Sequence, residues 1–218
     1  MIRLLISTVL LCGISFSSVA AQSAANKTVN VATNSAEQTL QQKLKQIKTF
    51  SAQFTQQVYD QQQQVLQQAE GELNLKQPEL FRFATTTPEE NLFIGDGQSL
   101  WFYSAPLEQL TIYDAAAEVN RTPFVLLTSN DPSLWANFTV KQQQQQFTIT
   151  AKDSSSQVTE LTLRFAGDAL SEMQVMDINQ QLSVFKFIAV QLNVPLADGL
   201  FHFTPPEFTE IDDQRSRN

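Results

Sequence analysis

The spacing of apolar side chains changes near residue 49. Before that point Leu40, Leu44 and Ile47 follow one another at steps of four and three residues, which places one apolar stripe along a helix. Ser35 is suited to cap the start of this helix, and Glu37 lies in its first turn, where negative charge is favourable. The pattern therefore predicts one N-terminal helix that begins after Ser35.

From residue 49 onward the pattern is typical of short strands. Phe50, Ala52 and Phe54 alternate with polar residues, although Phe50, Phe54 and Val58 also fit a helical spacing; we interpret the run as a strand that starts near Thr49. Alternation and turn residues predict further strands over 69–76, 80–85, 91–94, 99–103, 107–113, 138–141, 147–151, 158–165, 172–178, 183–192 and 201–203. Close spacing without long helices indicates antiparallel hairpins in one large sheet or barrel.

Two short helices interrupt this run of strands. Thr122 and Asp131 each precede a proline, and a capping residue followed by proline is a good helix start. We predict helices over 124–128 and 133–138, both rich in large apolar side chains. Because such helices must cover something apolar, they indicate a hydrophobic surface beneath them.

One strand, within residues 99–103, breaks the expected alternation. Leu100, Trp101, Phe102 and Tyr103 are apolar in an unbroken row, whereas a strand with one solvated face should alternate. In an unbulged hairpin Leu100 and Phe102 share a face with Phe93, and we place that face inward. A bulge at the glycine-containing turn would instead bring Trp101 and Tyr103 inside. The outward face is then either covered by neighbouring chain or exposed as a partner-binding patch.

The first residues have the composition of a secretory signal peptide. A short positive start is followed by a mostly apolar stretch and by small residues that suit cleavage, Val19-Ala20-Ala21. We expect a signal peptide over 1–21, a flexible lead-in over 22–35 and a single domain over 36–218. Cys12 is the only cysteine of the chain and lies within the signal, so the mature protein has neither a disulfide nor thiol chemistry.

Charge and motifs exclude several classes of function. The formal net charge is −8, or −9 once Arg3 is removed, and no basic cluster suggests a nucleic acid partner. His202 is the only histidine, and the adjacent carboxylates Glu89–Glu90 and Asp212–Asp213 point apart in extended chain. We therefore expect no enzymatic activity, no bound metal and no cofactor.

Phenylalanine is unusually prominent among the aromatic residues. There are sixteen Phe residues against three Tyr and two Trp, and the Phe side chain lacks the polar tip that suits half-wet sites. The composition fits either a large, well-filled core or an apolar cavity, and composition alone leaves both possibilities open.

Six segments together resemble the periplasmic outer-membrane lipoprotein carrier proteins of Gram-negative bacteria. They are FSAQFTQQV (50–58), PELFRF (78–83), DGQSLWFY (96–103), LEQLT (107–111), TPFVLL (122–127) and FHFTPPEFTEIDDQR (201–215). The resemblance implies an unclosed antiparallel β-barrel of about eleven strands, with three helices as a lid over a hydrophobic cavity. It also implies a soluble periplasmic chaperone, expected to be a monomer, for the acyl chains of lipoproteins. Its implied partners are an inner-membrane ATP-driven release complex that loads it and an outer-membrane receptor that takes the cargo.

The resemblance also implies particular site residues. The expected acyl-chain lining is Leu44, Ile47, Phe50, Phe81, Phe83, Phe93, Phe124, Leu127 and Trp135. Many members of the family have an arginine immediately before the proline that follows the second strand, and its hydrogen bonds to the helices help to keep the lid shut. Here that position is Gln77, beside Lys76, and we expect these two residues to control the lid, with Arg82 as a further possible substitute for the arginine.

Other functions compete with the carrier hypothesis. A general periplasmic binder of lipids or other hydrophobic ligands would share the cavity, and only the resemblance separates it from a lipoprotein carrier. A secreted enzyme is disfavoured because no catalytic constellation is recognisable. A structural β protein with a dry core is disfavoured by the two apolar helices within the run of strands.

Overall fold

The computed structural model describes residues 35–115, 123–129 and 131–215. The predicted signal peptide, the lead-in before Ser35 and the predicted cap Thr122 lie outside these residues. The helices and strands in chain order are α1 (Ala36–Gln46), β1 (Thr49–Tyr59), β2 (Val65–Lys76), β3 (Leu80–Thr87), β4 (Asn91–Asp96), β5 (Ser99–Ser104), β6 (Gln109–Asp114), α2 (Pro123–Thr128), α3 (Pro132–Trp135), β7 (Phe138–Gln143), β8 (Gln146–Ala151), β9 (Val158–Ala166), β10 (Ala169–Asp177), β11 (Leu182–Leu192), the 3-10 helix η2 (Asp198–Phe201) and β12 (Glu210–Asp213).

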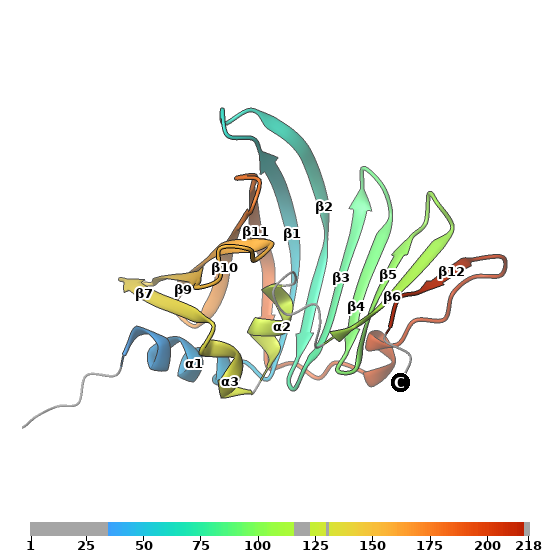
Figure 1. Cartoon of the computed structure of the whole chain (residues 1–218). Coiled ribbons are helices and arrows are strands. Elements are labelled where there is room, and N and C mark those ends of the chain that lie inside the picture. Colours follow the sequence, from blue (N-terminus) through green and yellow to red (C-terminus); the bar gives the residue numbers. More distant parts are fainter. Residues whose placement is uncertain (1–34, 116–122, 130, 216–218) are drawn as a thin grey trace, which may run out of the picture. The chain divides into compact units, whose positions relative to one another are not determined.

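The strands of the described residues form one open sheet within the unit that spans residues 34–218. Its order is β12-β6-β5-β4-β3-β2-β1-β11-β10-β9-β8-β7, so β12 and β7 are its two edges and the sheet does not close into a barrel. Neighbouring strands are antiparallel except for β12, which pairs in parallel with β6. The sheet curves, and the helices α1, α2 and α3 lie on its concave side (Figure 1). This confirms the predicted mainly-β, unclosed architecture, with twelve strands in place of about eleven.

Two predicted elements differ from the structure, and one strand was not predicted. Residues 201–203 are not a strand, because Phe201 ends the helix η2, and the last strand is instead β12, which the sequence did not suggest. The predicted helix 133–138 ends at Trp135, because Phe138 already pairs with Ala151 at the start of β7. Apart from their exact ends, the remaining predicted strands and helices are confirmed.

The predicted caps of two helices are confirmed. Ser35 Oγ accepts a hydrogen bond of 3.1 Å from the backbone N–H of Gln38, and the Gln38 side chain accepts one of 3.1 Å from the N–H of Ser35, which together form a capping box. The Asp131 carboxylate accepts a hydrogen bond of 2.8 Å from the N–H of Ser133 at the start of α3. These bonds satisfy backbone donors that a helix leaves unpaired at its first turn.

A stack of phenylalanine rings joins the concave face of the sheet to the helices. Phe54 of β1 stacks on Phe83 of β3, with ring centroids 4.6 Å apart. Phe124 of α2 packs against Phe81 at 5.3 Å and against Phe83 at 5.2 Å, and Phe83 meets Phe185 of β11 edge to face at 5.9 Å. Aromatic pairs at such separations contribute beyond the burial of their area, so these rings fix the position of α2 over the sheet.

The register of the hairpin of β4 and β5 explains the unbroken apolar row from Leu100 to Tyr103. Phe93 pairs directly with Phe102, and no bulge occurs at the turn. Leu100 and Phe102 therefore share the concave face with Phe93, as predicted for the unbulged hairpin. Gly95 lies within β4 rather than in the turn. A Cβ atom at Gly95 would lie only 2.3 Å from the Cε1 atom of Phe81, so the position has no room for a side chain.

The opposite, convex face of this hairpin is covered by the C-terminal segment. Tyr103 packs against Phe203 with ring centroids 5.0 Å apart, and the Arg215 guanidinium lies 5.9 Å from the centre of the Trp101 ring. Phe201 is buried at 1% exposure, and η2 contacts β3 and β4. The second apolar face of β5 is thus a second small core, closed by residues that follow β11.

Asp96 holds the turn between β4 and β5. Its Oδ1 accepts backbone hydrogen bonds from Gln98 at 2.8 Å and Ser99 at 2.7 Å, and its Oδ2 accepts one of 2.7 Å from the Trp101 indole. Partial burial by itself would raise the pKa of Asp96, but these hydrogen bonds, with a smaller contribution from His202, hold it below its ordinary value of 3.8. The charged carboxylate therefore stabilises the hairpin at neutral pH.

We predict that Asp96→Asn lowers the free energy of unfolding by about 1 kcal/mol at pH 7, a modest value because the group is partly exposed to solvent. The folded-state pKa is the lower one, so the stabilisation is fully present above the unfolded-state pKa and is lost as the pH falls through the folded-state value. The difference in urea-unfolding free energy between parent and variant should therefore shrink at acidic pH. Glu89→Gln, which neutralises an exposed carboxylate, serves as the control. An equal difference at neutral and acidic pH would contradict the prediction.

Candidate functional site: an apolar cleft under helix α2

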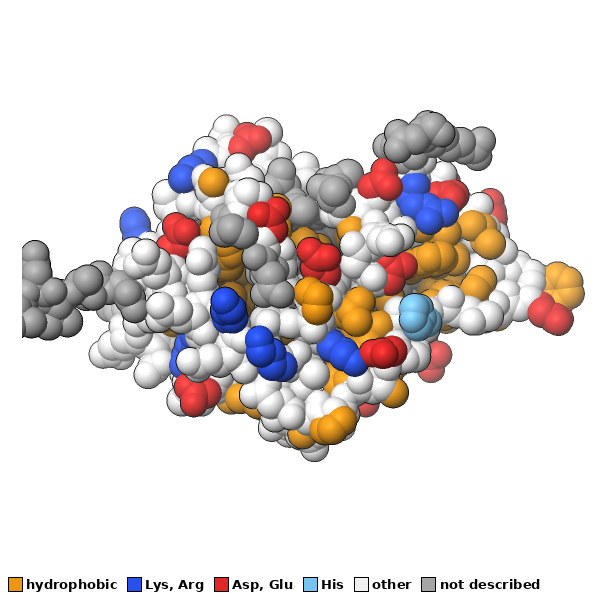
Figure 2. Space-filling view, turned by 90° about the horizontal axis from the view of Figure 1, so that it is seen from below, with side chains coloured by type: hydrophobic (Ala, Val, Ile, Leu, Met, Phe, Trp, Pro, Cys, Tyr) orange, Lys and Arg blue, Asp and Glu red, His pale blue; other side chains and the backbone are white. Residues whose placement is uncertain are grey.

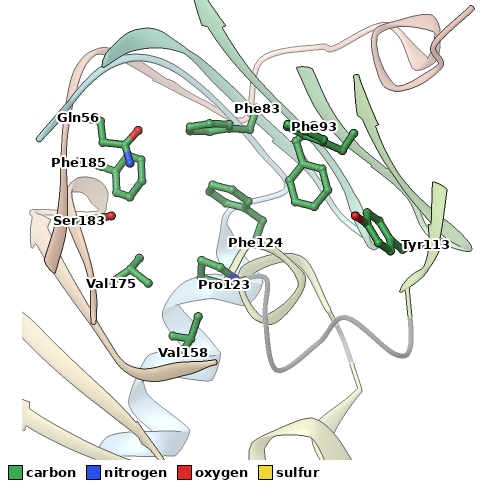
Figure 3. Close-up of a pocket in the computed structure, with 11 residues that line it drawn as sticks. Gln56, Phe83, Phe93, Tyr113, Pro123, Phe124, Val158, Val175, Ser183 and Phe185 are labelled. Carbon is green, nitrogen blue, oxygen red and sulfur yellow. The ribbon is translucent and has the colours of Figure 1, made fainter. Parts of the chain in front are cut away.

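An apolar cleft of about 470 Å³ opens between the concave face of the sheet and α2. Strands from both halves of the sheet contribute to its walls, and α2 supplies the side that faces them (Figure 3). The volume lies within the range of about 300–1,000 Å³ that is typical of small-molecule sites. The lining residues are Gln56, Phe83, Phe93, Phe102, Tyr113, Pro123, Phe124, Val158, Val175, Ser183 and Phe185.

The strand register aligns the aromatic part of this lining. Phe83, Phe93 and Phe102 are direct partners on three consecutive strands, which places their side chains side by side on the concave face. On the other wall, Phe185 of β11 is the direct partner of Gln56 of β1. Residues on one face of a strand recur at every second position, so a pattern of alternation is enough to build this surface.

The cleft contains no ionisable group other than a tyrosine among its described lining residues. Its polar side chains are those of Gln56, Ser183 and Tyr113. Seen from below, the described residues show hydrophobic side chains at the surface between charged ones, on the side where the helices lie (Figure 2). The uncharged lining of the cleft suits the apolar part of a ligand, because burial of apolar area is favourable without directional contacts.

The connection between β2 and β3 holds two helices near their C-terminal ends. The Gln77 side-chain amide donates a hydrogen bond of 2.9 Å to the Leu44 carbonyl near the end of α1. Two residues further on, the backbone N–H of Glu79 donates one of 3.2 Å to the Thr128 carbonyl at the end of α2. One short connection therefore binds the C-terminal ends of both α1 and α2, and the helix-facing role expected of Gln77 has a geometric basis.

The hydrogen bonding of Gln77 is incomplete. Its Oε1 atom is buried and has no hydrogen-bond partner among the described residues. A buried acceptor without a partner loses its hydration and gains nothing in exchange. The side chain of Gln77 therefore holds α1 through its amide donor alone.

Lys76 contacts a different part of the structure. Its Nζ atom donates a hydrogen bond of 2.9 Å to the Leu196 carbonyl and is paired with the Asp198 carboxylate. Both partners belong to the segment that leads to the convex face, rather than to α1 or α2. The neighbouring cation Arg82 approaches Glu72 at 3.8 Å. A role of Lys76 in the lid remains a prediction, and its observed contacts lie outside the helices.

The nine residues predicted to line the cavity fall into distinct environments. Phe83, Phe93 and Phe124 line the main cleft, and Phe81 borders a second hollow of about 200 Å³ beside Leu100 and Leu134. The other five are packed in the core: Leu44, Ile47, Phe50 and Leu127 surround a space of only about 10 Å³ beneath α1, and Trp135 is 4% exposed. Contact of these five residues with a ligand remains a prediction and would require the helices to move.

Several lining residues were absent from the predicted set. Phe102 was expected to point inward, and it lines the cleft. The strands after α2 and α3 also contribute lining residues that were not predicted, namely Val158, Val175, Ser183 and Phe185. Val175 lies two positions after Met173, and Phe185 lies two positions after Ser183, so each pair shares one face of its strand. This spacing could have indicated an inward face. Which inward positions meet open space rather than another side chain depends on the placement of α2, which alternation does not reveal.

The described residues offer neither a candidate metal site nor a membrane-spanning helix. They contain no group of three or more His, Cys, Asp and Glu side chains that could hold a metal ion. Among the same residues, no helix is both long and apolar enough to cross a membrane.

The fold and the cleft define a class of protein, namely an open curved sheet with a helix-covered apolar binding cleft. A sequence model described as outer membrane lipoprotein carrier protein LolA matches residues 45–204. The chain belongs to this family of outer-membrane lipoprotein carrier proteins.

Relatives of the chain carry the same description. The outer-membrane lipoprotein carrier protein of Pseudoalteromonas translucida is 41% identical over 171 residues, covering 77% of this chain and 82% of its own. That of Photobacterium profundum is 40% identical, with 78% and 85% covered. A solved structure of an uncharacterized conserved protein from Thermus thermophilus has a TM-score of 0.51 at 11% identity, covering 83% of this chain and 100% of that one, and supports the fold alone.

We predict that Val175→Trp fills the cleft and weakens binding of an apolar fluorescent probe such as N-phenyl-1-naphthylamine. Val175 lines the cleft from β10, so a larger ring there occupies the space that the probe needs. The affinity should fall about tenfold or more, because losing a few buried apolar contacts removes at least about 1.4 kcal/mol.

Val184→Trp is the matched control for this prediction, because Val184 pairs with Gln57 and points to the other face of the sheet. Thermal unfolding followed by circular dichroism establishes that both variants are folded. Unchanged probe affinity in folded Val175→Trp would show that the probe does not enter this cleft.

Proposed function

We propose that the protein carries acylated lipoproteins across the periplasm by sheltering their acyl chains in the cleft under α2. The observation that carries this proposal is an apolar, uncharged cleft on a chain that belongs to the outer-membrane lipoprotein carriers. The signal-like residues 1–21 support export to the periplasm. The absence of a catalytic constellation from the sequence fits a passive carrier, with no enzymatic activity.

The energy of lipid transfer explains why a carrier and its partners are needed. A buried CH₂ group contributes about 0.8 kcal/mol, and a triacylated lipoprotein has roughly forty of them, so leaving a membrane costs on the order of 30 kcal/mol. Non-covalent binding saturates near about 20 kcal/mol, so binding to the carrier cannot extract the cargo alone. We therefore infer that an ATP-driven complex in the inner membrane loads the protein and that a receptor at the outer membrane unloads it.

We infer that the helices move during loading, because the cleft is small for a cargo with several acyl chains. At about 30 Å³ for each water-sized group, a volume of about 470 Å³ holds roughly sixteen groups, or about one acyl chain. Further chains would need space to open beneath α1 and α2, where Leu44, Ile47, Phe50 and Leu127 now pack together. The same volume also suits a single-chain lipid, which favours the general lipid binder as the second candidate function.

Release of lipoproteins from spheroplasts tests the carrier. Adding the mature protein should bring acylated lipoproteins into the soluble fraction, whereas Val175→Trp should release fewer and Val184→Trp as many as the parent. If the parent releases none but binds free fatty acid or phospholipid normally, the protein is a general lipid binder rather than a lipoprotein carrier.

We further predict that Gln77→Arg slows the release of cargo about fivefold. An arginine offers more donors than glutamine, and hydrogen bonds from a charged donor to the carbonyls of Leu44 and Thr128 would be stronger by about 1 kcal/mol. The rate of transfer from preloaded protein to acceptor vesicles measures the effect.

Gln98→Arg adds the same charge at an exposed turn and should transfer cargo at the parental rate. Equal rates for Gln77→Arg and the parent would contradict the proposed role of this connection in holding the helices.

A further inference from the structure

Two polar side chains interrupt an otherwise apolar wall of the cleft. The concave row of β1 is formed by Phe50, Ala52 and Phe54, all buried, and its next member is Gln56. On β11 the concave row of Phe187 and Phe185 continues to Ser183. Both polar residues are half-buried, and both line the main cleft.

The ladder between β1 and β11 brings the two residues together. Gln56 is the direct partner of Phe185, and Ser183 is the direct partner of Val58. Gln56 and Ser183 are therefore diagonal neighbours on one face of an antiparallel pair. Both side chains lie on the same wall of the cleft, on either side of Phe185 (Figure 3).

Neither the Gln56 nor the Ser183 side chain has a hydrogen-bond partner among the described residues, although both side chains are half-buried in the cleft. The remaining polar side chain of the lining, Tyr113, lies on the opposite wall in Figure 3. The donors of Gln56 and Ser183 are thus available to a ligand that enters the cleft.

We propose that Gln56 and Ser183 form a subsite that hydrogen-bonds an uncharged carbonyl of the bound lipid, the ester or amide at the head of an acyl chain. This rests on the proposed function of the cleft in holding acyl chains. The amide N–H and the hydroxyl both donate to a carbonyl oxygen, and the described lining has no cation that would stabilise a carboxylate or phosphate.

The neighbours of Gln56 give the bound lipid a direction. A carbonyl held at Gln56 leaves the hydrocarbon tail to lie along Phe83 and Phe93, which line the same cleft. The subsite therefore fixes which end of the lipid is held at the wall formed by β1 and β11.

The test compares two ligands of equal chain length, methyl decanoate and dodecane, which differ in the ester group. Their dissociation constants are measured by displacement of N-phenyl-1-naphthylamine from the mature full-length protein and its variants. Gln56→Leu and Ser183→Ala should each lower the affinity for the ester relative to the alkane about three- to tenfold, the effect of one hydrogen bond. Gln53→Leu, an exposed glutamine on the opposite face of β1, should leave the ratio of affinities unchanged.

The outcomes separate this inference from the proposed function. An unchanged ratio in folded Gln56→Leu and Ser183→Ala, with both ligands still bound, overturns the subsite while the apolar cleft stands. Loss of the ester preference in Tyr113→Phe instead of these two variants also overturns it. If the parent protein binds neither ligand, the subsite and the proposed function fail together.

Discussion

An open sheet can keep an apolar concave face in water only while other parts of the chain cover it, because exposed hydrocarbon is unfavourable in proportion to its area. In this protein the cover depends on a few hydrogen bonds. The connection after β2 holds α1 through Gln77 and α2 through Glu79, and the ring of Phe124 seats α2 on the sheet. The convex face of the β4–β5 hairpin is closed separately by the C-terminal segment, so the helices can shift without uncovering that face.

Much of the fold follows from local rules that the sequence displays directly. Ser35 predicts the start of α1 because its hydroxyl can accept a backbone hydrogen bond, and the structure contains that bond. Alternation places Phe83 and Phe93 on one face, and the hairpin without a bulge adds Phe102. Within the cleft, the sequence therefore predicts the aromatic wall built from consecutive strands.

Other features depend on contacts between segments far apart in the chain. Glu210–Asp213 has no apolar alternation and becomes a strand only because β6 offers an unpaired edge. Leu44, Ile47 and Phe50 are apolar and inward as predicted, but α1 packs so closely that almost no space is left beside them. A pattern of side chains predicts the direction in which a residue points, whereas an open cleft requires the distance between two layers.

The phenylalanine wall has a consequence for the kinetics of unloading. Ring faces offer a hydrocarbon chain contacts without preferred direction, so neighbouring positions along the wall differ little in energy. A bound chain can then slide outward one methylene at a time, and each step exposes a group worth about 0.8 kcal/mol rather than the whole chain at once. If the next apolar surface is already in contact with the mouth of the cleft, each methylene that leaves is buried again, and the lipid passes over a series of low barriers in place of a single high one.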